Sequence, residues 1–327
     1  MTRYIVRHLA GLIPVFFGIT LISFLVMHLA PGGPSDISSS MNPKVSYEAR
    51  IRLDKLYGLD KPLIVQYKDW LVRVVRFDFG RSFIDDRPVF DKIIEKMPVT
   101  IFINLSSLVI ILAVGIPIGA LSAVRRNGLF DRFSAVFVFA GYSIPEFWLA
   151  LLLMSVFGIS LHWLPISGIK SIDFEYYSLP LKILDVARHL VLPVLLASFG
   201  GLAGISRYMR SSMSVVMRQE YIRTARAKGL PERKVIYVHA LKNAILPVIT
   251  ILGLSVPALI GGSVIFESIF AIPGMGRLFY ESVMARDYSV IMGILSIGAI
   301  LTLAGNFIAD MAYSFADPRI MSGGDGR

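Results

Sequence analysis

The sequence predicts an all-α integral membrane protein with six transmembrane helices and a helical extracytoplasmic insertion after the first helix. Hydrophobic residues make up 55% of the 327-residue chain and charged residues only 17%, too few to cover the surface of a soluble domain of this size. The apolar residues are also collected in long runs with almost no charge. Because neither a repeat nor a second soluble domain is visible, we expect one membrane domain over residues 1–327.

Each predicted span is an apolar run that can cross most or all of about 30 Å of hydrocarbon at about 1.5 Å per residue. The first span has no Asp, Glu, Lys or Arg, and its length favours a retained helix over a cleaved signal peptide. Prolines inside several spans are tolerated where neighbouring helices satisfy the freed carbonyl groups. The six spans are Leu9–Leu29, Pro98–Val124, Phe133–Gly158, Leu190–Ser206, Ala244–Phe266 and Tyr288–Ala309.

The charges between the spans predict the orientation of the chain. Loop 125–132 has three basic residues against one acidic residue, and residues 207–245 have nine basic and two acidic residues. In the alternate loops, 159–189 and 267–287, acidic residues offset all the basic ones. By the positive-inside rule, the two basic loops and both termini are cytoplasmic. The net charge of +10 therefore reflects placement in a bilayer, and we expect contact with lipid and none with nucleic acid.

Residues 30–98 form the predicted extracytoplasmic insertion, with twelve basic and ten acidic residues. Apolar spacing predicts one helix within 46–59 and a second, amphipathic helix within 62–80. One side of the second helix is expected to carry Leu63, Tyr67, Trp70, Leu71 and Val74. The insertion is either a helical cap lying on the outer membrane surface or a contact surface for an extracellular partner.

Residues 207–245 form the predicted cytoplasmic loop, and its basic segment 220–247 has a helical pattern that is interrupted once. The interruption is at Gly229, and Pro231 suits the first turn of a new helix. The segment therefore predicts a helix, a tight bend and a second helix before the fifth span. Its small residues would let another surface come close, and its basic side chains could bind carboxylates or carbonyl groups. Alternatively, its charges only maintain topology and contact anionic headgroups.

The sequence lacks the patterns of common catalytic sites. It contains no G-x-x-x-x-G-K-[ST] phosphate loop, no H-E-x-x-H zinc motif and no G-x-S-x-G nucleophile motif. The five histidines are scattered, and the chain has no cysteine, which excludes disulfides and thiolate metal sites. We therefore expect no catalytic residue, no metal site and no cofactor bound by this chain.

Glu146 is an acidic residue midway along the third predicted span, directly after Pro145. Because a charge inside the membrane is costly unless it is paired or hydrated, Glu146 is a candidate for a substrate pathway, together with Phe147 and Trp148. Alternatively, Pro145 breaks the helix near the interface and Glu146 is shallower than hydropathy implies. Glu267, at the end of the fifth span, is expected to be solvated at the interface.

Several strings resemble one family of transport proteins. TARAKG at 224–229 resembles the cytoplasmic EAA loop of ABC-importer permeases, in the form found in the B-type subunit of the dipeptide/oligopeptide/nickel family. The resemblance covers almost the whole chain, and FESIF-x-IPGMGRL is its most specific part. The other matching strings, in order, are RYIVRHLAGLIPVFFGITLISFLVMHLAPG, YGLDKPLIVQY, DFGRSF, SIPEFWLALLL, SVIFESIFAIPGMGRLFYESVMARDYSVIMG and DPRI.

The resemblance implies a type I ABC importer permease fold and a location in the inner (cytoplasmic) membrane of a prokaryote. It implies a homologous second permease subunit, two ATP-binding subunits that hold ATP and magnesium, and an extracytoplasmic substrate-binding protein that delivers peptide. The EAA-like loop would dock onto an ATP-binding subunit and pass its motion to the membrane helices. The implied docking residues are Glu220, Tyr221, Arg223, Thr224, Ala225, Arg226, Ala227, Lys228, Gly229 and Leu230.

The sequence also leaves other functions open. Nickel and glutathione-type importers of the same family share the permease pattern, so the resemblance leaves the substrate undecided. A secondary transporter would need paired intramembrane charges and usually an internal repeat. An intramembrane enzyme would need a nucleophile–base or metal constellation within the spans, and the sequence offers none. The peptide-importer permease is therefore the preferred interpretation.

Overall fold

The computed structural model describes residues 2–29, 55, 60–255 and 258–316. Over these residues the secondary structure is helix and turn, apart from one isolated β-bridge between Arg81 and Pro88. The all-α prediction is therefore confirmed for the described part of the chain. The predicted helix within 46–59 lies outside the described residues except at Lys55.

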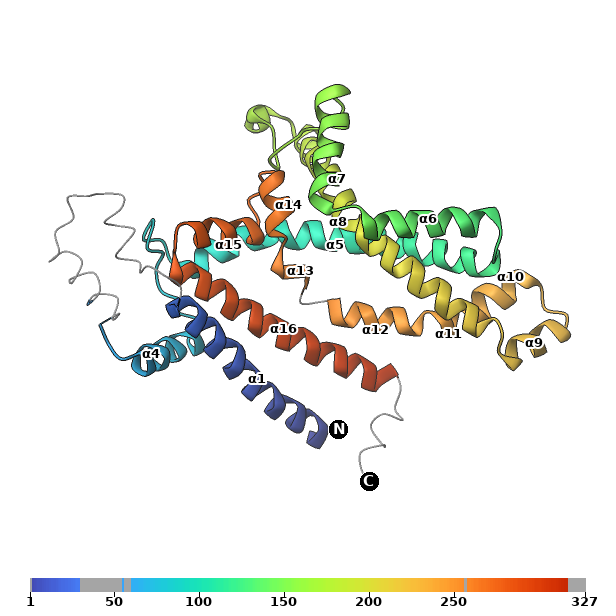
Figure 1. Cartoon of the computed structure of the whole chain (residues 1–327), viewed down its shortest axis with the longest axis horizontal. Helices are drawn as coiled ribbons and strands as arrows, with labels where there is room; N and C mark the ends of the chain where they lie inside the picture. The colour runs from blue at the N-terminus through green and yellow to red at the C-terminus, as the bar shows by residue number, and fades with distance from the viewer. Residues whose placement is uncertain (1, 30–54, 56–59, 256–257, 317–327) are drawn as a thin grey trace. The chain divides into compact units, whose positions relative to one another are not determined.

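The chain divides into two compact units. Figure 1 labels the helices of both. The first unit consists of Met1–Thr100, Ile260–Val264 and Pro273–Arg327, and the second of Ile101–Leu259 and Ile265–Ile272. The long helix α5 (Val89–Val124) contributes its beginning to the first unit and the rest to the second. The other helices of the first unit are α1 (Thr2–Leu29), α4 (Leu63–Val75), α15 (Met275–Met284) and α16 (Tyr288–Ala316).

The second unit contains most of the short helices, and α13 (Ala258–Gly261) and α14 (Val264–Ile269) contain boundaries between the units. Two of its turns are π-helical, η1 (Met154–Ser160) and η3 (Val235–Ala240), and η2 (Ile172–Tyr176) is a 3₁₀-helix. Its α-helices are α6 (Leu129–Ser143), α7 (Glu146–Leu153), α8 (Leu179–Val216), α9 (Glu220–Ala227), α10 (Glu232–Lys234), α11 (Leu241–Ala244) and α12 (Leu246–Ser255).

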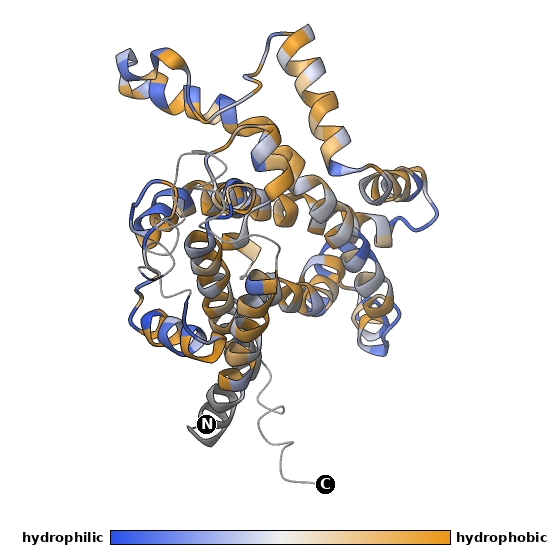
Figure 2. Cartoon of the chain, turned by 60° about the vertical axis from the view of Figure 1, so that its left-hand side comes forward, coloured by the Kyte–Doolittle hydropathy of each residue, from blue (hydrophilic) through white to orange (hydrophobic). Residues whose placement is uncertain are grey.

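Four helices in the described part of the chain are long and apolar enough to cross a membrane. They are Gly11–Leu29 of α1, the whole of α5, the whole of α8, and Tyr288–Phe307 of α16. A fifth candidate is the pair formed by α6 and α7–η1, which is bent by 103° at the break. Figure 2 shows hydrophobic colouring along the long helices and hydrophilic colouring in many of the turns. The chain is therefore a multi-pass membrane protein with four or five apolar spans among these residues.

Two predicted spans differ from the observed helices. The fifth, Ala244–Phe266, is divided among α12, α13 and α14, with residues 256–257 outside the described part. The fourth, Leu190–Ser206, is the central part of the 38-residue helix α8, so the loop expected from residue 207 begins as helix. Hydropathy shows where a helix is apolar but not where it ends. The Arg, Ser and Met residues that follow Ser206 are polar or less apolar, yet all of them are compatible with a helix.

Glu267 was expected to be solvated, and that expectation is wrong. Its side chain lies in the short helix α14 and is 1% exposed. The expectation assumed that Glu267 follows the end of a long straight span. Instead, the segment is broken into short helices, and Glu267 lies on the buried side of α14 beside Phe266.

The predicted amphipathic helix of the insertion is confirmed as α4. Trp70 and Val74 are buried in a cluster with Phe24 of α1, while Leu63 is half exposed. The Tyr67 hydroxyl lies 3.0 Å from Thr20 Oγ1, which joins α4 to α1 by a hydrogen bond. In the same unit, α1 and α16 pack against each other (Figure 1).

Two of the strings that resemble the transport family are in contact inside the first unit. One is DFGRSF, at residues 78–83, and the other is the stretch around Asp287. Ser82 and Asp287 are each 1% exposed, and the Ser82 hydroxyl donates a hydrogen bond to the Asp287 carboxylate. The Phe83 N–H also donates to Asp287, at 3.1 Å. Asp287 immediately precedes α16, so these bonds fix the loop around residue 82 to the beginning of that helix.

Small residues allow α5, α6 and α8 to pack closely in the second unit. A Cβ on Gly119 of α5 would collide with the Ser206 carbonyl oxygen of α8. A Cβ on Gly141 of α6 would lie 2.6 Å from the Cβ of Ala203, also on α8. Close backbone approach at small residues is typical of helix packing within membranes. At these positions α8 therefore packs against α5 and α6 with only glycine or alanine side chains between the backbones.

Candidate functional site

The segment 220–247 folds as a helix, a bend and a helical run, as predicted. Helix α9 ends before Gly229, whose φ is +75°. The Leu230 N–H bonds to the Ala225 carbonyl at 3.4 Å, and the Gly229 N–H bonds to the Arg226 carbonyl at 2.9 Å. This is the Schellman arrangement, in which a left-handed residue caps a helix and glycine avoids the Cβ penalty. The glycine of the TARAKG string therefore fixes the bend.

An ion pair spans the bend between α9 and α10. Arg226 donates from Nη2 to Glu232 Oε1 at 2.7 Å and from Nε to Oε2 at 3.2 Å. This donation holds the pKa of Glu232 below its usual value, against a smaller opposing effect of burial. Glu232 is also the first residue of α10, where a carboxylate is favourable for the helix dipole. The bidentate pair therefore ties the two helices together.

The inner side of the segment is part of the core of the second unit. Ile222 and Val235 are fully buried, and they belong to one cluster with Met209 and Met213 of α8. The Ser212 hydroxyl of α8 donates to a carbonyl of α11 at 2.8 Å. Because packed protein interiors have low compressibility, a displacement of the segment is passed on to the residues it contacts. The segment and the end of α8 therefore form one packed body.

The predicted docking residues in the tip of the bend divide between the inner and outer sides. Ala225 is buried against the core, and Leu230 is half buried. Ala227, Lys228 and Gly229 are exposed. Within the described part of the chain, nothing lies within 4 Å of the position that a Cβ on Gly229 would take. We call the exposed Ala227, Lys228 and Gly229 the coupling tip.

The remaining predicted docking residues are engaged with their own chain. Arg223 pairs with Glu220 at 2.8 Å on the exposed side of α9. The Thr224 hydroxyl donates to the Glu220 carbonyl at 3.0 Å. The Tyr221 hydroxyl accepts a hydrogen bond from Asn243 Nδ2 at 3.0 Å, which joins α9 to α11. Among the exposed predicted docking residues, those of the coupling tip have neither an ion pair nor a side-chain hydrogen bond within the described part of the chain.

The three predicted pathway residues lie in the first turn of α7, directly after the break at Pro145. Phe147 and Trp148 are each 50% exposed. Glu146 Oε1 lies 3.6 Å from the position that a Cβ on Gly200 of α8 would take. The break at Pro145 is therefore present, and Glu146 faces α8 at the break rather than within a continuous helix.

A cavity of about 410 Å³ lies where α5, α6 and α8 meet. Arg210 binds the buried carboxylate of Asp131 through two bonds of 2.6 and 2.9 Å. Arg207 is exposed and, within the described part of the chain, has neither an ion pair nor a hydrogen bond. The polar residues that line the cavity are Ser122, Ser134, Tyr142, Ser143, Ser206, Arg207 and Arg210.

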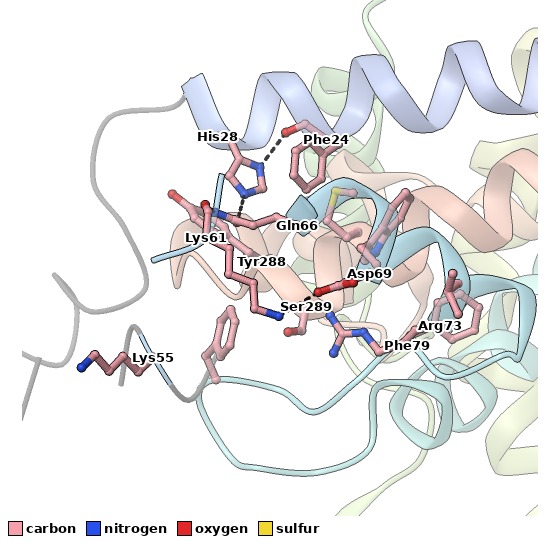
Figure 3. Close-up of a pocket in the computed structure, with 14 residues that line it drawn as sticks. Phe24, His28, Lys55, Lys61, Gln66, Asp69, Arg73, Phe79, Tyr288 and Ser289 are labelled. Carbon is pink, nitrogen blue, oxygen red and sulfur yellow. Dashed lines mark hydrogen bonds and ion pairs between the residues drawn. The ribbon is translucent and has the colours of Figure 1, made fainter. Parts of the chain in front are cut away.

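A separate pocket of about 490 Å³ lies in the first unit, between α1, α4 and the beginning of α16 (Figure 3). Phe24 and Phe79 contribute apolar surface, and Lys61 pairs with Asp69 at 2.8 Å. His28 lies 3.0 Å from Gln66 Oε1, which joins the end of α1 to α4. The polar side of α4 therefore faces this pocket, and both interpretations of the insertion, cap and contact surface, remain predictions.

Sequence comparison decides the family. Residues 115–322 match the family described as "Binding-protein-dependent transport system inner membrane component". The chain belongs to this family. Residues 1–104 match the corresponding N-terminal component of binding-protein-dependent transport system membrane proteins. Together, the two matches extend over almost the whole permease.

Several relatives of this permease are similar over nearly their full length. The oligopeptide transport system permease protein AppB of Bacillus subtilis (strain 168) is 43% identical, over 98% of this chain and 99% of the relative. The di/tripeptide permease DppB of Pseudomonas aeruginosa (strain UCBPP-PA14) is 37% identical, with the same coverage. The dipeptide permease DppB of Escherichia coli (strain K12) is 35% identical, again with that coverage.

These findings confirm the resemblance stated from the sequence. The chain is a membrane permease subunit of an ABC importer and not an enzyme, and it resides in the inner membrane as a multi-pass protein. Permeases of this family work with ATP-binding and substrate-binding partners.

Sequence reasoning missed the polar residues between α6 and α8. Asp131 was counted only as a loop charge, and Arg207 was assigned to a cytoplasmic loop. A signal was nevertheless present, since Gly200, Gly204 and Arg207 follow the i, i+4, i+7 spacing of one helix face. That signal becomes visible only if the helix continues beyond Ser206, as α8 does.

Proposed function

We propose that this permease forms half of the translocation pathway of an ATP-driven peptide importer and works by alternating access. The names of its relatives, which refer to oligopeptide, di/tripeptide and dipeptide transport, support a peptide substrate. A homologous second permease subunit would form the other half. Two ATP-binding subunits and an extracytoplasmic substrate-binding protein would complete the assembly.

The membrane arrangement belongs to the same proposal. The chain crosses the membrane six times in the type I importer fold, with the α12–α14 region supplying the broken fifth span. Both termini and the segments 125–132 and 207–245 are cytoplasmic, which the distribution of basic residues supports. Residues 30–98 are extracytoplasmic. The chain binds no cofactor, and ATP and magnesium bind to the partner subunits.

The capped bend at Gly229 is the observation that supports a role in coupling ATP hydrolysis to the movement of the membrane helices. It exposes a small, glycine-containing tip, while the other side of the same helices is packed on α8. An ATP-binding subunit that holds the coupling tip and closes on ATP would therefore displace α9, α11 and α8 together. If the two membrane arrangements of alternating access differ in free energy by a few kcal/mol, ATP binding to the partner subunits can shift the equilibrium from one to the other. Glu146, Phe147 and Trp148 would line the pathway.

Substitution of Gly229 tests the proposal. Gly229→Trp projects a large side chain from the tip, where its Cβ meets no atom of the described chain, so the variant is expected to reach the membrane and lose uptake. Gly229→Asn is the matched control, because asparagine tolerates a positive φ, and it is expected to retain most uptake. Both variants are measured by labelled dipeptide uptake in cells that express the whole importer, with membrane abundance determined by immunoblot.

Two outcomes would contradict the proposal. Normal peptide uptake by Gly229→Trp at normal abundance would exclude the tip as the coupling site. Uptake of nickel or glutathione, and not of peptides, by the unaltered importer would overturn the substrate class. Peptide-stimulated ATP hydrolysis by the purified complex provides the independent check of coupling.

A further inference from the structure

The cavity where α5, α6 and α8 meet has a positive charge that the chain does not neutralise. Its volume of about 410 Å³ is within the range of pockets that bind small ligands. Among the described residues that line it, two are arginines and none is acidic. Arg210 is held by Asp131, whereas Arg207 has neither an ion pair nor a hydrogen bond within the described part of the chain. The cavity therefore fits an anionic group, and Arg207 is the side chain available to bind it.

Exposed apolar side chains of α6 line the same cavity. Ala135, Val138, Phe139 and Tyr142 have the i, i+3, i+4, i+7 spacing that places residues on one face of a helix. Phe139 is 73% exposed and Tyr142 is 58% exposed. A free inorganic anion would make no use of this apolar face. An amphiphile with an anionic head would contact both the arginine and the apolar side chains.

The position of the cavity along the helices identifies the kind of amphiphile. The hydroxyls of Ser122 and Ser134, which also line it, lie 2.7 Å apart near the ends of α5 and α6 that flank loop 125–132. That loop is cytoplasmic in the proposed topology, and Phe139 lies ten residues beyond the beginning of α6, which is about 15 Å at about 1.5 Å per residue. The lining therefore extends from the cytoplasmic end of α6 toward the middle of the bilayer, as a lipid of that leaflet does.

We propose that this cavity binds an anionic phospholipid of the cytoplasmic leaflet, with its phosphate on Arg207 and an acyl chain along Val138 and Phe139. The guanidinium group can donate two parallel hydrogen bonds to one phosphate. Basic pockets between membrane helices on the cytoplasmic side are known sites for lipid head groups. The inference goes beyond the proposed function and rests on its topology only for the choice of leaflet.

Photolabelling of the complete importer tests this site. The complex is reconstituted in phosphatidylcholine vesicles that contain a small amount of phosphatidylglycerol with a diazirine in its acyl chain, and the labelled segments are identified by mass spectrometry. Labelling of residues 135–142 is divided by labelling of α1, whose apolar residues are largely exposed in this chain, so that differences in protein amount cancel. In the unaltered importer, unlabelled phosphatidylglycerol is expected to compete for the label on 135–142, and added phosphatidylcholine is not.

Three variants make the test specific. Arg207→Gln is expected to lower the labelling ratio about tenfold, because a hydrogen bond between two charged groups is lost. Arg207→Lys keeps the positive charge and is expected to retain more of the label than Arg207→Gln does. Arg218→Gln removes an exposed positive charge that lies just after α8 and outside the cavity, and it is expected to leave the ratio unchanged.

Three results would overturn the inference. Absence of label on 135–142 in the unaltered importer would show that another subunit covers the cavity. An unchanged ratio in Arg207→Gln would exclude Arg207 as the phosphate ligand. A smaller preference of that variant for a free over an amidated tripeptide in uptake, without a change in the labelling ratio, would assign the charge to the substrate. Because labelling requires no transport, failure of the unaltered importer to take up peptide would overturn the proposed function alone.

Discussion

Glu232 is the residue at the bend whose contribution depends on pH. Its bonds from Arg226 hold its pKa below the ordinary value of 4.5. A depressed folded-state pKa means that the pair stabilises the bend above the unfolded pKa and that this stabilisation is lost as pH falls through the folded value. Both side chains are partly exposed, so the contribution is limited to about 1 kcal/mol.

Hydrogen exchange measures this contribution. Glu232→Gln is expected to raise amide exchange at Gly229 and Leu230 at neutral pH by up to about fivefold, which corresponds to about 1 kcal/mol. In the unaltered protein, protection relative to the intrinsic exchange rate should stay constant between neutral pH and about 5 and fall below about 4.5. Protection that is unchanged in Glu232→Gln would show that the Gly229 cap alone holds the bend.

At the residue scale, local chemistry was predictable and tertiary contacts were not. The bend at Gly229 followed from the Gly-Leu-Pro order, because a left-handed cap and a proline act through their immediate neighbours. The division of the small residues into buried Ala225 and exposed Ala227 depends on α8, which is close in space but separate along the chain. Spacing within α9 alone could not assign the buried side.

Helix α8 is closely approached by two neighbouring helices. The carbonyl of Ser206 lies against Gly119 of α5, and Ala203 lies against Gly141 of α6. Gly119→Ala is therefore expected to destabilise the protein by about 1–3 kcal/mol, as overpacking of a filled interior does. The melting temperature of the purified importer should fall by several degrees.

Gly18 on α1 provides the matched control for this prediction. A Cβ at Gly18 meets no atom of the described residues within 4 Å, so Gly18→Ala adds a methyl group to a helix interior without a clash there. Replacing glycine by alanine in a helix is favourable by about 0.5–1 kcal/mol, so the melting temperature should stay equal or rise. Equal effects of Gly119→Ala and Gly18→Ala would show that α5 and α8 are not closely packed.

The transmembrane helices were predicted best where the apolar run of the sequence forms one continuous helix. The spans of α1, α5 and α16 are of this kind. The break at Pro145 was foreseen as one of two alternatives for Glu146, but its bend of 103° was not. The division of the fifth span was missed because a hydropathy window averages over α12, α13 and α14 and is insensitive to the breaks between them.

For the whole molecule, the predicted orientation in the membrane can be tested by labelling single cysteines. The chain has no cysteine of its own, so an introduced cysteine is the only one in this chain. The substitution Arg126→Cys places a cysteine in the predicted cytoplasmic loop 125–132. The substitution Tyr176→Cys places one in the predicted external loop 159–189, where Tyr176 is 90% exposed. A membrane-impermeant maleimide applied to intact cells is expected to label only Tyr176→Cys. Both variants should be labelled after permeabilisation, and labelling of Arg126→Cys in intact cells would reverse the assigned topology.

The family and fold class of the whole chain were accessible from the sequence, since they rest on composition and on strings spread along its length. The contact between α6 and α8 was not, because it depends on two helices packing through Gly141 and Ala203. Pairing of Asp131 with Arg210, which leaves Arg207 unpaired, is likewise a property of that packing.

The ion pairs of the coupling segment have a consequence for how the importer assembles. Because Arg223 and Arg226 are already neutralised by Glu220 and Glu232, they contribute little long-range attraction to a partner. Those pairs use both acidic residues of the segment, so its net positive charge comes from the other basic residues, including Lys228 in the coupling tip. The attachment of the ATP-binding subunits should therefore weaken as salt shortens the Debye length, which is about 3 Å at 1 M. Washing membranes with molar sodium chloride should loosen those subunits, and Lys228→Gln should reduce the effect of salt.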